Sequence, residues 1–141
     1  MANYCCAVRT NYFHVNDPDG FKQFMDKVYG CEDAVDVWEE KDKDGETVFG
    51  FGCYGAIAGL VGDDDEDDCE YDAFVDGLQK YVADDDAIII MESGNEKLRY
   101  VIGSATIITS KKYEYLDIAS LAAARAAEII GNPGWVTKVD Y

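Results

Sequence analysis

The stretch that decides the fold is YDAFVDGLQKYVADDDAIIIME, residues 71–92, which changes from a helical pattern to a strand pattern. In its first half, apolar side chains recur at helical spacing, at Tyr71, Phe74, Val75, Leu78 and Val82. This spacing predicts a helix over 71–82 with one buried face. The run 88–90 is apolar on both faces of an extended chain, which is typical of a central strand. We therefore expect a helix followed by a strand inside a sheet.

Helical and strand patterns alternate on both sides of this stretch. Upstream, Asp17 and Pro18 suit the cap and first turn of a helix that Gly30 ends. Its apolar stripe consists of Phe21, Phe24, Met25 and Val28. We then expect a hairpin with strands over 34–39 and 47–53. Downstream we expect a second hairpin over 87–92 and 98–109 with its turn at 93–96, a helix over 118–130 that stops at 131–133, and a last strand over 135–139.

The two helix–hairpin units, 19–57 and 71–108, align at an offset of 53 residues. The aligned identities include Lys27 with Lys80, Asp33 with Asp86, Ala34 with Ala87 and Glu39 with Glu92. Chance similarity between two units of this kind is the alternative to an internal repeat. We expect one α+β domain over 1–141, with a mainly antiparallel sheet of about six strands, three helices on one face and internal β-α-β repeats.

The composition excludes several classes of protein. The chain has 141 residues, with 12 Lys and Arg against 29 Asp and Glu, and a formal net charge of −17. Proteins that bind nucleic acid or anionic membranes need basic side chains, so we expect neither as a direct partner. No apolar run approaches the roughly 20 residues of a membrane span, and the first residues lack the pattern of a secretion signal. Five cysteines, an odd number with two adjacent, favour reduced thiols and a cytoplasmic protein.

The negative charge is concentrated in one quarter of the chain. Residues 63–96 have a net charge of −13, whereas 97–141 have +2 and 1–62 have −6. Acids near the start of the 71–82 helix stabilise its dipole by about 0.3–1 kcal/mol each, and a solvated acidic loop is the alternative for the rest. Carboxylates fixed on a helix, however, form a directional negative surface. We expect this surface to bind a partner through Asp63, Asp64, Asp65, Glu66, Asp67, Asp68, Glu70, Asp72, Asp76, Asp84, Asp85 and Asp86.

Four patterns resemble cofactor or metal motifs without meeting their requirements. Residues 50–55 match G-x-G-x-x-G, but glycines and acids follow where a dinucleotide site needs a helix. The turn 40–45 lacks the glutamate that a calcium loop needs at its twelfth position, and the run 63–68 lacks the glycine of its sharp turn. The cysteines and His14 include no ligand pair at zinc-finger spacing. We expect no bound cofactor, and metal binding stays open.

The single histidine, His14, limits the catalytic options. General acid–base chemistry would have to use carboxylates, tyrosines or cysteines. A nucleophilic pair of Cys5 or Cys53 with His14 lacks a recognisable third group to orient it. We therefore expect no catalytic residues.

The segments 2–4 and 7–15 resemble small proteins carried by phages and mobile elements. In size, acidity and layout, the chain is similar to the DNA-mimic proteins that such elements encode against host defence, the antirestriction and anti-CRISPR inhibitors. The resemblance implies a non-enzymatic inhibitor whose acidic face occupies the basic DNA-binding channel of a nuclease. A type II CRISPR effector or a restriction enzyme is the implied partner. The near-neutral C-terminal third implies one acidic binding face.

The sequence leaves two other functions open. An acidic immunity or adaptor protein that neutralises a basic partner unrelated to DNA would need the same surface. A zinc-binding protein would use the cysteines and His14. In addition, exposed aromatic side chains at Tyr12, Phe13 and Trp38 would allow a homodimer.

Overall fold

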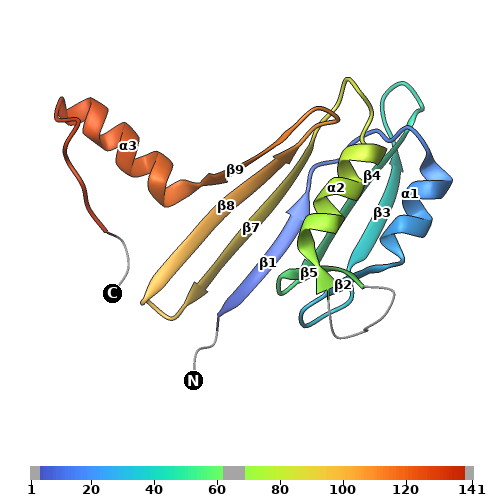
Figure 1. Ribbon diagram of the computed structural model, residues 1–141, viewed down its shortest axis with the longest axis horizontal. Helices are drawn as coiled ribbons and strands as arrows, with labels where there is room; N and C mark the ends of the chain where they lie inside the picture. Colours follow the sequence, from blue (N-terminus) through green and yellow to red (C-terminus); the bar gives the residue numbers. More distant parts are fainter. Residues whose placement is uncertain (1–3, 62–68, 139–141) are drawn as a thin grey trace.

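The computed structural model describes residues 4–61 and 69–138 (Figure 1). Its elements confirm the α+β class. In chain order they are β1 (Cys5–Thr10), α1 (Pro18–Met25), β2 (Val28–Gly30), β3 (Asp36–Lys41), β4 (Thr47–Tyr54), β5 (Ile57–Val61), β6 (Cys69–Glu70), α2 (Tyr71–Tyr81), β7 (Ile88–Glu96), β8 (Tyr100–Ile108), β9 (Tyr113–Asp117) and α3 (Ile118–Ile130).

A six-stranded antiparallel sheet forms the frame of the structure, in the order β3-β4-β1-β7-β8-β9. β1 is the first strand of the described residues, yet it lies inside the sheet and pairs with β4 on one side and β7 on the other. The apolar run at the start of β7 is interior, as expected, because β8 pairs along its other edge. Three short strands, β2, β5 and β6, form a second sheet.

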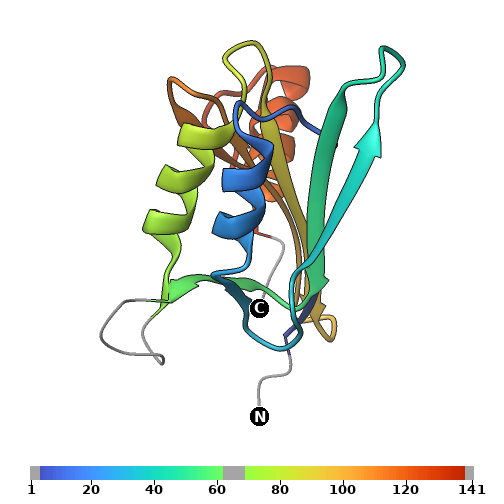
Figure 2. The ribbon, with the colours of Figure 1, turned by 90° about the vertical axis from the view of Figure 1, so that its right-hand side faces the viewer.

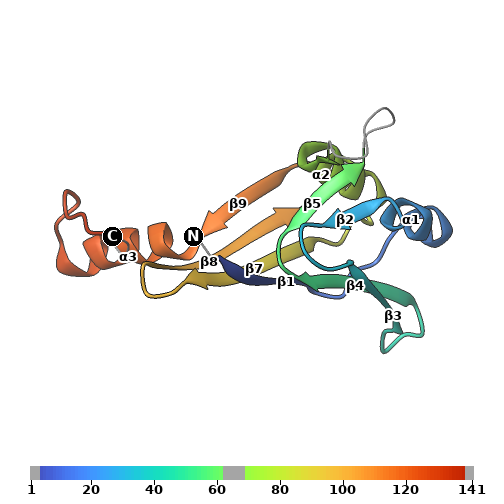
Figure 3. The same ribbon diagram turned by 90° about the horizontal axis from the view of Figure 1, so that it is seen from below.

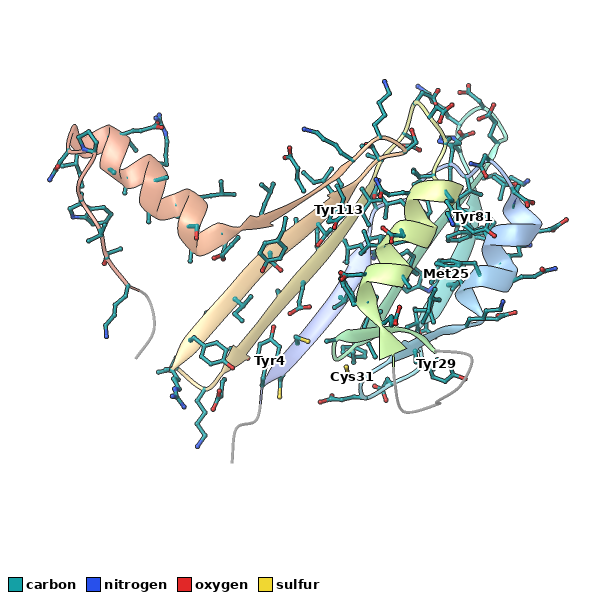
Figure 4. All side chains as sticks on the ribbon, viewed as in Figure 1. Tyr4, Met25, Tyr29, Cys31, Tyr81 and Tyr113 are labelled. Atoms are coloured by element: carbon teal, nitrogen blue, oxygen red, sulfur yellow. The ribbon has the colours of Figure 1, made fainter. Side chains whose placement is uncertain are left out.

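α1 and α2 cover one face of the large sheet (Figure 2). A core of aromatic side chains lies between these helices and the sheet. The ring centroids of Phe21 in α1 and Phe49 are 5.0 Å apart, and those of Phe74 in α2 and Phe51 are 5.9 Å apart. Tyr81 lies between the two helices (Figure 4), where its ring contacts that of Phe21. Burial of each such side chain stabilises the fold by about 1.5–3 kcal/mol.

α3 forms over the residues predicted for it but lies apart from α1 and α2. It extends from the end of β9 beyond the sheet, at the opposite end of the molecule from α1 (Figures 1 and 3). Asp117 caps its start by accepting a hydrogen bond from the backbone N–H of Ala119 at 3.2 Å. Gly131, with a φ of 82°, ends it in the left-handed conformation. The helix layer of the sheet therefore consists of α1 and α2.

The first helix is shorter than its apolar stripe predicts. α1 ends at Met25, and Val28 lies in β2, where it pairs with Leu60 of β5. Val28 is buried in this strand, and it would also be buried on the helical stripe, so the apolar pattern alone does not separate the two outcomes. The partner strand comes from the glycine-rich segment after β4, in which Gly59 has a φ of 126° and lies against the backbone of Glu70.

The C-terminal half also departs from the expected boundaries. β7 continues through the expected turn to Glu96, and the chain reverses at 97–99, with Lys97 at a φ of 50°. The strand β9, which the sequence did not predict, pairs along β8. The expected last strand is wrong for residues 135–138, which have no regular secondary structure, and Val139 lies outside the described residues.

The two units proposed as a repeat, 19–57 and 71–108, each contain a helix and an antiparallel hairpin. Their places in the sheet differ, because β1 pairs with the second strand of the first hairpin and the first strand of the second. The internal repeat stays a prediction, as does the single-domain assignment.

Candidate functional site

The twelve acidic residues expected to bind a partner fall into three groups. Residues 63–68 lie outside the described part of the chain. Glu70 and Asp72 lie at the start of α2, and Asp76 is exposed along it. The group 84–86 follows the other end of this helix, which spans 11 residues and hence about 16 Å. The described acids therefore lie along α2 and beyond both of its ends instead of forming one cluster.

The loop after α2 meets two other segments at one end of the large sheet (Figure 1). One is the turn between β3 and β4, and the other is the connection between β1 and α1, which contains His14. We refer to this region as the acidic end. Its members are His14, Asp42, Asp44, Glu46, Asp84, Asp85 and Asp86.

His14 joins the segments through both of its ring nitrogens. Nδ1 lies 2.8 Å from Oδ2 of Asp86, and Nε2 lies 2.8 Å from Oδ2 of Asp42 and 3.5 Å from Oε2 of Glu46. A protonated ring donates on both sides at once. The hydrogen bonds to Asp42 and then Asp86 raise the pKa of His14 to about 9. The side chain is therefore an imidazolium at neutral pH.

Backbone N–H groups also hold the two partner carboxylates. Oδ1 of Asp42 accepts two N–H groups of its own turn, each at 2.9 Å. Oδ2 of Asp86 accepts the N–H of His14, and Oδ1 accepts that of Ala87, both at 2.8 Å. The hydrogen bond from His14 lowers the pKa of Asp42. Burial raises the pKa of Asp86, but the bonds from the backbone and ring of His14 outweigh it and lower that pKa. Both groups are thus ionised and fixed in position.

The acidic end stays negative despite its histidine. Six carboxylates against Lys41, Lys43 and the imidazolium leave a formal charge of −3. A hollow of about 530 Å³ opens beside the ring, and Glu46 and Asp85 line it. Carboxylates at such a hollow suit the fork of a guanidinium or the point charge of an ammonium group.

His14, Asp42 and Glu46 also offer the ligand types that a divalent cation uses. One ligand atom from each lies within 4.8 Å of the others. The Nδ1 contact with Asp86 is of the kind that orients metal-bound histidines. The imidazolium proton already bridges Nε2 and Asp42, however, so ion pairing accounts for the same geometry. No cysteine of the described residues belongs to such a group.

The glycine pattern 50–55 lies in and just after β4 and opens no helix. A Cβ on Gly52 would come within 2.5 Å of the carbonyl oxygen of Val8 and 3.0 Å of the Trp38 ring. Close packing of strand and ring therefore explains this glycine.

The chain matches no protein-family model, no curated protein and no solved structure. Over 4–61 and 69–138, no helix has the length and apolar character that crossing a bilayer requires.

Sequence reasoning found part of the acidic end and missed the rest. It assigned 84–86 to a binding surface but treated the segment 41–45 only as a hairpin turn. The available signal was His14 itself, because a single histidine among 29 acids has a high chance of carboxylate neighbours. Which carboxylates they are depends on the three segments meeting in space.

The expected exposed aromatic group is only partly correct. Phe13 is fully buried, because it bridges to Phe49 in the sheet and its ring packs edge-on against Phe21 and Phe51. Tyr12 is exposed. Trp38 is half-buried, with the guanidinium carbon of Arg9 5.0 Å from its ring centroid.

Proposed function

We propose that this protein is a non-enzymatic inhibitor that binds a basic DNA-binding surface of a host-defence nuclease and keeps DNA from it. The nuclease would be a type II CRISPR effector or a restriction enzyme. The observation that supports the proposal is the acidic end, where separate segments present carboxylates in fixed positions. DNA presents its phosphates to the basic side chains of its binding proteins in a comparable way. The acids at 63–68 and on α2 would extend the contact.

Fixed carboxylates favour binding because ordering a flexible side chain costs about 0.5–1.5 kcal/mol. Asp42 and Asp86 already have backbone and imidazolium partners, so they lose little freedom when a partner arrives. Glu46 and Asp85 line the hollow beside them and can accept an arginine of the partner. Charge-assisted hydrogen bonds of this kind contribute about 1.5–3 kcal/mol each.

The proposal places the protein in the cytoplasm, together with DNA and the nucleases that act on it. The free thiols of Cys6, Cys31 and Cys53 support a reducing compartment. The +2 charge of residues 97–141 supports a one-sided contact, since that third of the chain has little to offer a basic channel.

Binding to purified nucleases of both classes, measured over a range of salt concentrations, tests the proposal. The test variant combines Asp44→Asn, Asp84→Asn and Asp85→Asn, which removes three exposed charges and leaves the ion pairs of His14 intact. The matched control variant combines Asp26→Asn, Glu32→Gln and Asp33→Asn, three exposed acids elsewhere on the surface.

We expect wild-type binding to weaken steeply with salt. Loss of three surface charge contacts, at about 0.5–1 kcal/mol each, reduces the affinity of the test variant about tenfold or more, while the control variant binds within about twofold of wild type. The proposal is wrong if neither nuclease class binds, or if this variant and one neutralised at 63–68 both bind like wild type. Equal binding to a basic protein without a DNA site would instead favour the immunity or adaptor function.

A further inference from the structure

The face of the large sheet opposite α1 and α2 (Figure 2) carries Asp36 and Glu40 of β3 and Glu114 of β9 on its outer strands, but its middle strands have little charge. The register pairs Arg9 with Met91 and Met91 with Ala105, so these three side chains form a row across that face. Because side chains alternate along a strand, the positions of β1, β7 and β8 on this face are Cys5, Ala7, Arg9, Ile89, Met91, Ser93, Asn95, Val101, Gly103, Ala105 and Ile107. We refer to them, with Tyr54 of β4, as the open face. Arg9 is its only charged residue.

Large apolar side chains lie exposed on the open face. Met91 is 59% exposed, Val101 63% and Tyr54 74%. Met91 lines a hollow of about 400 Å³ that also includes Tyr54. It lines a second hollow of about 230 Å³ that reaches Leu116 of β9 and α3. The two hollows meet at Met91, so an apolar part of the open face extends from Tyr54 to α3.

α3 presents a second exposed apolar surface next to it. Ile118, Ala122 and Ile129 fall on one helical stripe, with Leu121 beside them, and all four are exposed. Arg125 lies on the same stripe, where its guanidinium pairs with Glu128 at 2.7 Å. The only buried residue of this helix is Ala127. Isolated helices of about 12–15 residues are marginal in water, and most helices in proteins are stabilised by packing of an apolar face. Within residues 4–61 and 69–138, this stripe has little such cover beyond Ile118, which packs over Gly103.

We propose that α3 and the open face form the interface of a homodimer, in which the α3 stripe of each copy packs on the open face of the other. The dimensions agree. From Ile118 to Ile129 the stripe is about 17 Å long, and the open face from β8 across β7 and β1 to β4 is about 14 Å wide. A two-fold axis makes both contacts equivalent, which is the commonest symmetry of soluble oligomers.

The exposed apolar area matches what a stable dimer needs. On α3, Ile118 is 61% exposed, Leu121 52% and Ile129 72%. With Met91, Val101 and Tyr54, and at about 100 Å² for a whole aliphatic side chain and about 200 Å² for a tyrosine, one copy offers about 450 Å² and two copies about 900 Å². A standard interface buries about 1,600 Å², of which about 56–65% is apolar. The apolar area that two copies expose is therefore nearly equal to the apolar area of a standard interface.

The charge distribution favours a second copy over other occupants. Two chains that each have a net charge of −17 repel each other, so their contact is favoured at surfaces with few charged residues. The open face and the near-neutral C-terminal third provide that surface. The acidic end lies at the opposite end of the molecule from α3 (Figure 1), so this contact keeps the two acidic ends apart and accessible. The dimer does not depend on the inhibitor function proposed above.

Molar mass in solution tests the dimer. We expect wild type at twice 15.6 kDa at micromolar concentration by light scattering or sedimentation equilibrium. The double variant Leu121→Glu with Ile129→Glu should have the mass of one chain, and so should Val101→Glu on the sheet side. These side chains are exposed, so the core is untouched. Leu98→Glu is the matched control, because Leu98 is 85% exposed in the β7–β8 turn, outside the proposed interface, and it should remain dimeric.

Hydrogen exchange gives a second readout at the level of α3. The amides of α3 should exchange faster when wild type is diluted. In the double variant they should exchange at the rate of diluted wild type, whatever the concentration. The amides of α1 and α2 should remain protected in both proteins. A wild-type chain that is monomeric at all concentrations overturns the proposal and leaves this face to a different partner. Dimers that persist in both interface variants also overturn it.

Discussion

His14 makes the stability of this protein depend on pH in a way that one substitution can isolate. In His14→Gln, a neutral amide replaces the ring that lies 2.8 Å from both Asp42 and Asp86, and both ion pairs are lost. The pKa of His14 is about 9 in the folded protein, against about 6.5 in an unfolded chain. Because the folded pKa is higher, the stabilisation is complete below about pH 6.5, declines as pH rises, and is lost above about pH 9.

The magnitude follows from these two pKa values. Their difference corresponds to about 3 kcal/mol if solvent has no access. The His14 side chain is 36% exposed, so water screens its ion pairs and reduces the contribution to about 1–2 kcal/mol. The free energy of unfolding of wild type minus that of His14→Gln should therefore be about 1–2 kcal/mol larger near pH 6 than near pH 9.5.

Urea unfolding of both proteins across this pH range, at one protein concentration, measures the difference. Groups that titrate alike in both proteins cancel when the two free energies are subtracted. Asp42 and Asp86 contribute little, because their lowered pKa values place their titration well below the pH range used. NMR gives the pKa directly, because His14 is the only histidine and its ring protons need no further assignment. A ring that titrates near its ordinary pKa, or a free-energy difference that is flat from about pH 6 to 9.5, would refute the reasoning.

Three further substitutions test the packing. Phe21→Ala removes a fully buried ring between Phe13 and Phe49 and should lower the free energy of urea unfolding by about 3–5 kcal/mol; a loss below about 1 kcal/mol would contradict the core described above. Gly52→Ala places a Cβ 2.5 Å from the carbonyl oxygen of Val8 and should cost about 1–3 kcal/mol, whereas Gly134→Ala, whose Cβ would meet nothing closer than 3.5 Å, should leave thermal unfolding unchanged. Asp117→Ala removes the cap of α3 and should destabilise that helix by about 1 kcal/mol, seen as amide exchange about fivefold faster in its first turn; equal exchange in wild type and variant would show that the cap contributes nothing.

Local signals made the three helices predictable. Asp17 accepts a hydrogen bond from the N–H of Gly20 as a cap should, Pro18 lies in the first turn, and Gly131 ends α3 in the left-handed conformation. The strands β2 and β9 were not predictable in the same way. Val28 suits a helical stripe and a strand equally, and its strand exists because a glycine-rich segment pairs with it. For β9, the register with β8 is a contact that no local pattern specifies.

In the candidate site, too, local sequence features were predictable and contacts between distant segments were not. The concentration of acids at 84–86 is visible in the sequence, and so is the Asp42 turn. Their meeting through His14 joins positions 28 and 72 residues away from the ring, at the same end of the sheet. Only the strand order, with β1 between β4 and β7, brings these loops to one place.

The position of β1 has a consequence for how the chain folds as it is made. β1 is synthesised before both of its neighbours, β4, which is complete at Tyr54, and β7, which is complete only at Glu96. An early unit of β1, β3, β4 and α1 can assemble during synthesis. In this unit one edge of β1 is unpaired and its core-facing side chains are not fully covered, because the residues that pair with and cover them come later in the chain. Such unpaired edges are where nascent chains associate wrongly. Long-range closure of this kind also slows folding relative to a chain that pairs its strands in order.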